Sequence, residues 1–266
     1  MKQRLYLALI LFLFTSNVQA EKPALALVID DLGYSFDLAK KVLDLPGNHS
    51  FAVIPDTTYS QKIAKYANLQ GHEVILHMPM QSSEDVSIEA SALHDRMTEL
   101  EITQNVSNML REVPHIKGIN NHMGSELTKF GYIMRPIMET IRQTSKNFYF
   151  LDSRTTPLSK AYQQALIAGL PTIKRDVFLD FDHSNRESII FQIDLWLKKA
   201  TDKGYAVAIA HPHPSTIELL KSKIPTASND YQFVTISQLL KLQNQQKPES
   251  YSWPKYLSRL QMDLKN

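Results

Sequence analysis

The 266-residue sequence predicts an α/β protein in which about seven or eight mostly parallel strands form a closed or nearly closed barrel. Short apolar runs alternate with segments whose apolar residues recur at helical spacing, from residue 24 to about residue 236. Strands joined through helices run parallel, with right-handed crossovers. The number of such units favours one barrel over two domains, and an open doubly wound sheet is the alternative.

The expected strands are short, apolar and buried, and amphipathic helices separate them. Strands are expected at residues 24–29, 49–54, 73–76, 117–121, 148–151, 172–178, 205–210 and 232–236. Helices are expected near residues 37–45, 59–69, 98–113, 132–144, 159–168, 185–203 and 216–223. Thr98 with Glu101 predicts a capping box, and Pro136 predicts a kink or a late helix start.

The N-terminus has the layout of a secretory signal peptide. Lys2 and Arg4 precede an apolar run over residues 5–14, and a small residue, Ala20, stands at the expected cleavage point. The run is shorter than the roughly 20 residues that usually span a bilayer, although an uncleaved anchor is the alternative. Residues 1–20 are therefore predicted to direct the mature chain to the periplasm.

The rest of the chain divides into a barrel domain at residues 21–242 and a polar linker with a short C-terminal helix at residues 243–266. No other segment is apolar enough to cross a membrane. A protein partner could dock on the C-terminal segment.

Composition excludes several functional classes. The chain is 43% hydrophobic and 21% charged and has no Cys, so it is neither disordered throughout nor a disulfide scaffold. Its formal charge of +2 comes from 29 basic and 27 acidic residues, and the signal peptide holds two of the basic ones. The mature chain is therefore neutral, which argues against charge-driven binding to nucleic acid or to an anionic membrane.

Ionisable side chains follow six of the expected strands at their carboxyl ends. In chain order they are Asp30 with Asp31, His77, His122, Asp152, Asp176 and His211. The loops at this end of a parallel barrel meet at one rim, so we expect these side chains to converge there. A single aspartate in such a place usually caps a helix and a single histidine is usually structural, but six together favour a common site.

The histidines and the paired aspartates predict a metal centre. Two buried carboxylates side by side would repel each other without a cation, whereas one can bind a cation while its neighbour stays free as a base. Two histidines and one carboxylate form an open site for zinc or a similar divalent ion. Such an ion lowers the pKa of bound water and polarises a carbonyl group.

Six segments resemble the motifs of the divergent polysaccharide deacetylases. They are VIDDLG (28–33), EVILHMPM (73–80), GINNHMGS (118–125), FLDSRT (150–155), RDVFLD (175–180) and AIAHPHP (208–214). The resemblance covers about residues 24–240 and implies a deformed (β/α) barrel that hydrolyses N-acetyl groups of a glycan with a metal ion. By position, it implies that Asp31 and His77 bind the metal. Asp30 would be the general base, and His211 the acid that protonates the leaving amine.

One feature departs from that family pattern. Typical members take a second histidine ligand a few residues after the first, but residues 78–82 here read MPMQS. His122, on the next expected strand, is the obvious substitute, so Asp31, His77 and His122 are the predicted ligands.

Four further residues could support the site. Asp152, Arg175 and Asp176 could orient the base or bind sugar hydroxyls, although a structural ion pair between Arg175 and an aspartate is an equal alternative. His213 could take a similar role or be only a loop residue beside two prolines.

Two functions are consistent with the sequence. The first is a periplasmic, zinc-dependent N-deacetylase acting on an acetylated envelope polysaccharide or on peptidoglycan, and the retained Asp30 and His211 favour it. The second is a catalytically inactive barrel that binds a glycan or a partner in cell-envelope maintenance. The missing loop histidine and the C-terminal segment favour this second function.

Overall fold

The computed structural model describes residues 22–84 and 86–245. The predicted signal peptide, residues 1–20, lies outside these ranges, and so does all of the predicted C-terminal segment except residues 243–245. Within the two described ranges, no helix is long and apolar enough to cross a bilayer.

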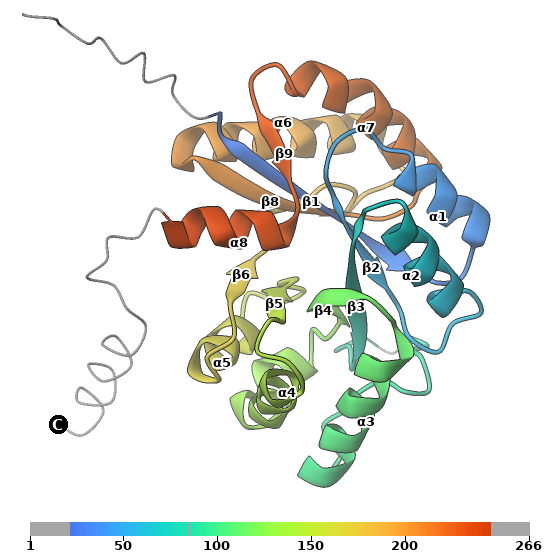
Figure 1. The fold of residues 1–266 in the computed structure, drawn as a ribbon, viewed down its shortest axis with the longest axis vertical. Helices are drawn as coiled ribbons and strands as arrows, with labels where there is room; N and C mark the ends of the chain where they lie inside the picture. Colours follow the sequence, from blue (N-terminus) through green and yellow to red (C-terminus); the bar gives the residue numbers. More distant parts are fainter. Residues whose placement is uncertain (1–21, 85, 246–266) are drawn as a thin grey trace, which may run out of the picture.

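A single curled parallel sheet forms the centre of the fold (Figure 1). Its strands are β1 (Ala24–Leu32), β2 (Ser50–Val53), β3 (Glu73–Met80), β4 (Ile116–Met123), β5 (Tyr149–Asp152), β6 (Thr172–Lys174), β7 (Val177–Phe178), β8 (Tyr205–Ala210) and β9 (Gln232–Val234). They follow the order β6-β5-β4-β3-β2-β1-β8-β7, and β9 also pairs with β1. The predicted α/β barrel-like class is confirmed, as a curled half-barrel rather than a ring closed between β6 and β7.

Helices alternate with these strands as the apolar spacing predicts. They are α1 (Phe36–Leu43), α2 (Ser60–Leu69), α3 (Glu99–Glu112), α4 (Gly131–Thr144), α5 (Ala161–Ile167), α6 (Arg186–Lys203), α7 (Pro214–Ala227) and α8 (Ile236–Gln245), with a 3₁₀ turn, η1 (Leu127–Lys129). Thr98 and Glu101 form the predicted capping box at α3, and Pro136 lies inside α4. Gly204 ends α6 in the left-handed conformation (φ 84°), which glycine adopts without strain.

The sheet buries a different apolar cluster on each face. In β1, the side chains of Leu25, Leu27 and Ile29 pack in the cluster under the outer helices, whereas Ala24, Ala26 and Val28 belong to the cluster inside the curl. This alternation is the two-residue period of a strand.

α8 completes the inner cluster with Ile236, Leu239 and Leu240. Its first backbone N–H groups donate to the side chains of Ser50 and Glu73, where β2 and β3 begin. α8 therefore covers the amino-terminal end of the curled sheet and continues to Gln245, past the predicted domain end at residue 242.

The predicted strand at residues 172–178 is wrong as one element. It divides into β6 and β7, which lie at opposite edges of the sheet. The backbone N–H of Arg175 still donates to Asp152 beside β6, whereas that of Asp176 donates to Val207 of β8. Residues 175 and 176 therefore cross from one sheet edge to the other.

A buried histidine near the start of β2 makes stability depend on pH. His49 is 1% exposed, its Nε2 lies 2.8 Å from the carbonyl oxygen of Pro46, and its Nδ1 has no hydrogen-bond partner among the described residues. Its ring packs against Phe51 and Phe233. Burial lowers the pKa of His49 to about 4 and outweighs the hydrogen bond to Pro46, which would raise it.

We expect acid to destabilise the fold partly through His49. Because its folded pKa lies below its unfolded value of about 6.5, the unfolded chain binds the extra proton first. The stabilisation is complete above that value and falls by about 3 kcal/mol as the pH drops towards 4. Urea unfolding of the wild type and of His49→Gln should show a shallower dependence on pH in the variant. His94→Gln, at an exposed position, is the control; equal slopes in all three proteins would contradict the assignment.

Candidate metal centre

At the end of β1, two adjacent aspartate side chains line one cavity. Successive residues of a regular strand point to opposite faces, but the pairing of β1 with β2 shifts register between Ile29 and Leu32. Asp31 sits in that irregularity with a left-handed backbone (φ 58°). As a result, Asp30 and Asp31 line the same cavity of about 440 Å³.

Asp31, His77 and His122 form a tight triangle of potential ligand atoms. Asp31 Oδ1 lies 3.1 Å from His77 Nε2 and 3.0 Å from His122 Nδ1, and the two nitrogens are 3.2 Å apart. A tetrahedral ion with bonds of about 2.0–2.1 Å holds its ligand atoms about 3.3 Å apart. Asp31 Oδ1 is also buried without a hydrogen bond of good geometry, so the three residues fit a zinc-like divalent ion.

The charges around Asp31 favour its ionised form. Burial alone would raise the pKa of its carboxyl group, but the contacts with His122 and His77 outweigh burial and hold the pKa below its ordinary value. Asp31 is therefore ionised at neutral pH, as a ligand must be.

Asn120 fixes the tautomer of His77. Its side-chain amide nitrogen donates to both carboxylate oxygens of Asp30, at 2.9 and 3.1 Å. Its oxygen must then accept the proton of His77 Nδ1, 2.8 Å away, which leaves the Nε2 lone pair facing Asp31. Asn120 was not predicted, although it stands two residues before His122 on the same face of β4.

Glu89 lies behind His122 on the side away from Asp31. His122 Nε2 is 3.8 Å from Glu89 Oε2, which is buried and accepts no hydrogen bond from the described residues, and the other carboxylate oxygen accepts from Tyr34. The separation is too long for a hydrogen bond, but a negative charge beside Nε2 favours the tautomer whose proton lies on that atom, which leaves Nδ1 free to bind a metal. Glu89 comes from the long loop between β3 and α3, and no sequence pattern singles it out.

Loss of the Glu89 charge should weaken metal binding. We expect Glu89→Gln to lower affinity for Zn²⁺ or Co²⁺ by about 10–100-fold, the usual cost of losing such a partner. Isothermal titration of metal-stripped protein measures the change. The matched control is Glu84→Gln in the same loop, since Glu84 also lines the cavity and the described structure pairs it with no histidine. Equal metal affinities in the two variants would show that Glu89 does not support the metal site.

Asp30 is a buried carboxylate placed to handle a proton. It is 2% exposed, and its Oδ2 lies 3.6 Å from His77 Nε2. Burial raises the pKa of Asp30 above its ordinary value, although His77, His211 and the Asn120 amide oppose that rise. A raised pKa suits a group that takes up a proton near neutral pH.

His211 follows β8 and is held by an aspartate that was not predicted. Its Nδ1 lies 3.0 Å from Asp180 Oδ1, while Asp180 Oδ2 accepts from the His211 backbone and from Thr216. Burial would lower the pKa of His211, but the bond to Asp180 and the charges of Asp31, Asp180 and Asp30 raise it to about 9. His211 is therefore protonated at neutral pH, with Nε2 3.8 Å from Asp31 Oδ2.

Two predicted supporting aspartates lie elsewhere. Asp176 pairs with Lys203 and accepts from the backbone of Val207, beside the first half of β8, because the chain crosses between β6 and β7 at this point. Asp152 is buried and accepts from the Arg154 backbone, Ser159 and Tyr162, so it shapes the loop after β5. Neither carboxylate is among the residues that line the cavity, and Asp176 forms no ion pair with Arg175.

Arg175 and His213 have different surroundings. Arg175 lines the cavity, and its guanidinium donates to the carbonyl oxygens of Ser153 and Arg154. His213 occupies the N-cap position of α7 without a side-chain capping bond, and its ring stacks on His183 with ring centroids 4.0 Å apart. It stands near Asp180 and His211, but hydrogen bonds already use both carboxylate oxygens of Asp180.

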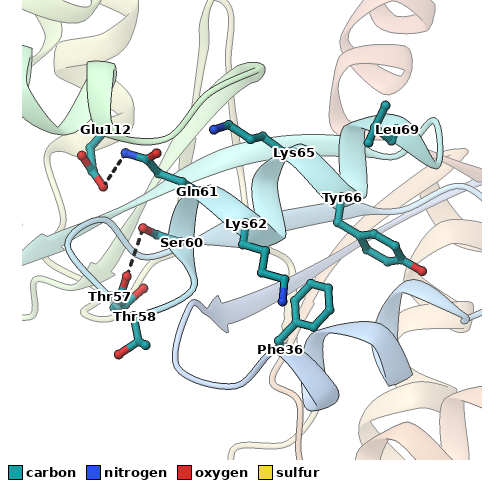
Figure 2. Close-up of a pocket in the computed structure, with 10 residues that line it drawn as sticks. All are labelled: Phe36, Thr57, Thr58, Ser60, Gln61, Lys62, Lys65, Tyr66, Leu69 and Glu112. Carbon is teal, nitrogen blue, oxygen red and sulfur yellow. Dashed lines mark hydrogen bonds between the residues drawn. The ribbon is translucent and has the colours of Figure 1, made fainter.

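A larger hollow of about 620 Å³ lies on the surface beside α2 and carries different chemistry (Figure 2). The Lys62 ammonium sits 4.0 Å from the centre of the Phe36 ring, and Gln61 donates to Glu112. Its lining contains neither a histidine nor an aspartate. The aspartates and histidines expected at the strand ends therefore line the smaller cavity and not this hollow.

The fold and the cavity define the class of this protein: a curled parallel α/β barrel with an Asp-His-His cluster at the carboxyl rim. The chain belongs to the divergent polysaccharide deacetylase family, whose model matches residues 27–240.

Two proteins resemble this chain in sequence, and a crystal structure resembles it in fold. The chain is 36% identical over 230 residues to the uncharacterized protein YibQ of Escherichia coli K12, covering 86% of this chain and 70% of that one. An uncharacterized protein of Haemophilus influenzae is 34% identical over 227 residues, covering 85% and 80%. The crystal structure of an uncharacterized protein from Agrobacterium tumefaciens C58 has a TM-score of 0.77 at 20% identity, covering 83% and 90%. The predicted family and barrel fold are therefore confirmed.

Proposed function

We propose that this protein is a periplasmic, metal-dependent hydrolase that removes N-acetyl groups from an envelope polysaccharide or from peptidoglycan. The observation that carries the proposal is that one cavity holds the ligand triangle, the buried Asp30 and His211, whose Nδ1 contacts Asp180. Family membership supports a glycan substrate, and the signal-peptide pattern supports the periplasm.

The cavity divides the chemistry among its residues. Asp31, His77 and His122 would hold the ion, and zinc suits two imidazoles and a carboxylate. A bound ion supplies a lower pKa for water and polarisation of the acetyl carbonyl. A hydrogen bond from His77 to Asn120 keeps the first imidazole in its binding orientation, and the charge of Glu89 favours the tautomer of His122 that leaves Nδ1 free.

Proton transfer falls to Asp30 and His211. Asp30 takes a proton from the attacking water as the water oxygen bonds to the acetyl carbon. When the carbon–nitrogen bond breaks, His211 gives its Nε2 proton to the leaving nitrogen, so the products are acetate and a free amine. Asp180 accepts from Nδ1 throughout and so keeps the Nε2 proton directed into the cavity.

The second candidate is a barrel that binds a glycan or a partner without chemistry. One observation favours it: the loop after His77 lacks the usual second histidine, and a residue of β4 takes that place. The hydrogen-bonded Asp30 and His211 favour the hydrolase, because buried ionisable groups are costly to keep without use.

Metal loading combined with acetate release separates the two functions. Protein spanning residues 21–266, stripped with a chelator and reloaded with Zn²⁺ or Co²⁺, should release acetate from acetylated chito-oligomers or peptidoglycan. The stripped protein should not. Bound metal without acetate release from either substrate would move the assignment to the binding function. N-terminal sequencing of the exported protein, expected to begin at Glu21, tests the location.

A further inference from the structure

Arg154 brings an unpaired positive charge to the cavity. Its side chain lines the cavity and is half-buried, yet among the described residues its guanidinium has no hydrogen-bond or ion-pair partner. Its backbone is left-handed (φ 49°), and its N–H donates to Asp152 while its carbonyl accepts from Arg175. A non-glycine residue stays in this conformation only where the surroundings fix it, so the position of Arg154 is set by the fold.

A second guanidinium lies close by and is held rigidly. Arg175 donates to two backbone carbonyls, and its guanidinium carbon stands 5.1 Å from the centre of the Phe178 ring. Burial lowers the pKa of Arg175, and the charge of Arg154 acts in the same direction. The carboxylates that act most strongly on the pKa of Arg175, Asp30 and Asp152, already accept other hydrogen bonds. Two partly desolvated like charges in one cavity are stabilised by an anion placed between them.

The other lining groups suit a sugar. The hydroxyl and amide side chains are those of Ser82, Ser125, Ser153, Thr155 and Asn121. Such groups match hydroxyls of a carbohydrate better than an apolar ligand. The carboxylates and histidines at the ends of β1, β3, β4 and β8 form the metal side of the cavity. A further carboxylate, Glu84, comes from the loop after β3, and the two arginines come from the loops that follow β5 and β6.

We propose that the substrate is an acidic glycan, and that Arg154, with Arg175 beside it, binds a carboxylate or phosphate group near the acetamido group that is cleaved. The inference rests on the proposed hydrolase function and narrows its substrate class. The anionic group lies against the arginines while the acetyl group faces Asp31 and the histidines.

Paired glycan probes test this subsite. Metal-loaded protein is titrated with a neutral N-acetylglucosamine tetramer, and with a tetramer of alternating glucuronate and N-acetylglucosamine. A third probe is a 6-phosphorylated N-acetylglucosamine oligomer. We expect at least one acidic probe to bind about tenfold or more tightly than the neutral one, since a charge-assisted hydrogen bond gives this factor. The stronger acidic probe identifies carboxylate or phosphate as the group recognised, and added salt should weaken only the acidic probes.

Replacement of Arg154 should remove the preference. Arg154→Gln should bind the acidic and neutral probes about equally, with affinity for the neutral probe unchanged. Arg154→Asn is the second variant, because asparagine tolerates a left-handed backbone. Arg135→Gln on α4 is the control, since it makes the same change in charge away from the cavity.

The outcomes separate this inference from the proposed hydrolysis. A preference for the neutral probe, equal binding by the wild type, or an acidic preference that survives in both Arg154 variants would overturn the subsite even if acetate is released. If binding follows Arg154 but no probe loses acetate, the subsite stands and the hydrolase function does not.

Discussion

Asp30→Asn and His211→Ala should each lower turnover by about 10²–10⁴-fold while metal affinity stays near that of the wild type. Each variant removes a group that transfers a proton in the proposed mechanism and that lies outside the ligand triangle. The asparagine introduced at position 30 keeps an oxygen that can accept from Asn120, so the bond that orients His77 survives. Acetate release gives the turnover, and titration with Zn²⁺ or Co²⁺ gives the affinity.

A conservative variant separates proton donation from structural support at His211. Asp180→Asn leaves the imidazole in place but removes the charge that helps to raise its pKa. Loss of rate should therefore be steepest at the alkaline end of the pH range, where His211 of this variant is neutral. Undiminished turnover in both the Asp30 and the His211 variants would refute the mechanism.

Asp31→Asn should lower metal affinity, whereas Asp30→Asn should not. Asp31 Oδ1 is the only carboxylate oxygen in the triangle, and a neutral amide oxygen is a poorer ligand for zinc. We expect metal affinity to fall further than in Glu89→Gln, and turnover to fall with it. Turnover should recover partly as Zn²⁺ is raised, whereas Asp30→Asn should gain nothing from added metal.

Comparing the metal affinities of Asp30→Asn and Asp31→Asn decides which aspartate binds the ion. If Asp30→Asn loses metal and Asp31→Asn keeps it, the roles of the two carboxylates are exchanged. If both keep it, the histidines bind the ion with another ligand.

The strand ends were the part of the site that the sequence could predict. Parallel strands place their carboxyl ends at one rim, so Asp31, His77, His122 and His211 converge as expected. The sequence predicted Asp176 at the rim because residues 172–178 have the apolar character of one strand. Nothing in that pattern marks the crossing between β6 and β7.

The residues that contact and support the predicted site histidines were harder to predict. Asp180, four residues after Asp176, follows β7 and faces His211, but the true strand end was needed to see it. Glu89 reaches His122 from a loop without periodicity, and only the folded chain shows which of several loop carboxylates turns inward. Asp152 follows its strand as predicted, but its carboxylate turns back to the loop backbone.

The placement of α8 has a consequence for how the protein can meet a polymer. α8 covers the amino-terminal end of the curled sheet, while the cavity opens at the carboxyl ends of the strands. The end of α8, at Gln245, therefore lies at the end of the sheet opposite the cavity. A long or anchored glycan of the proposed kind would therefore meet the loops at the carboxyl ends of the strands, and not α8.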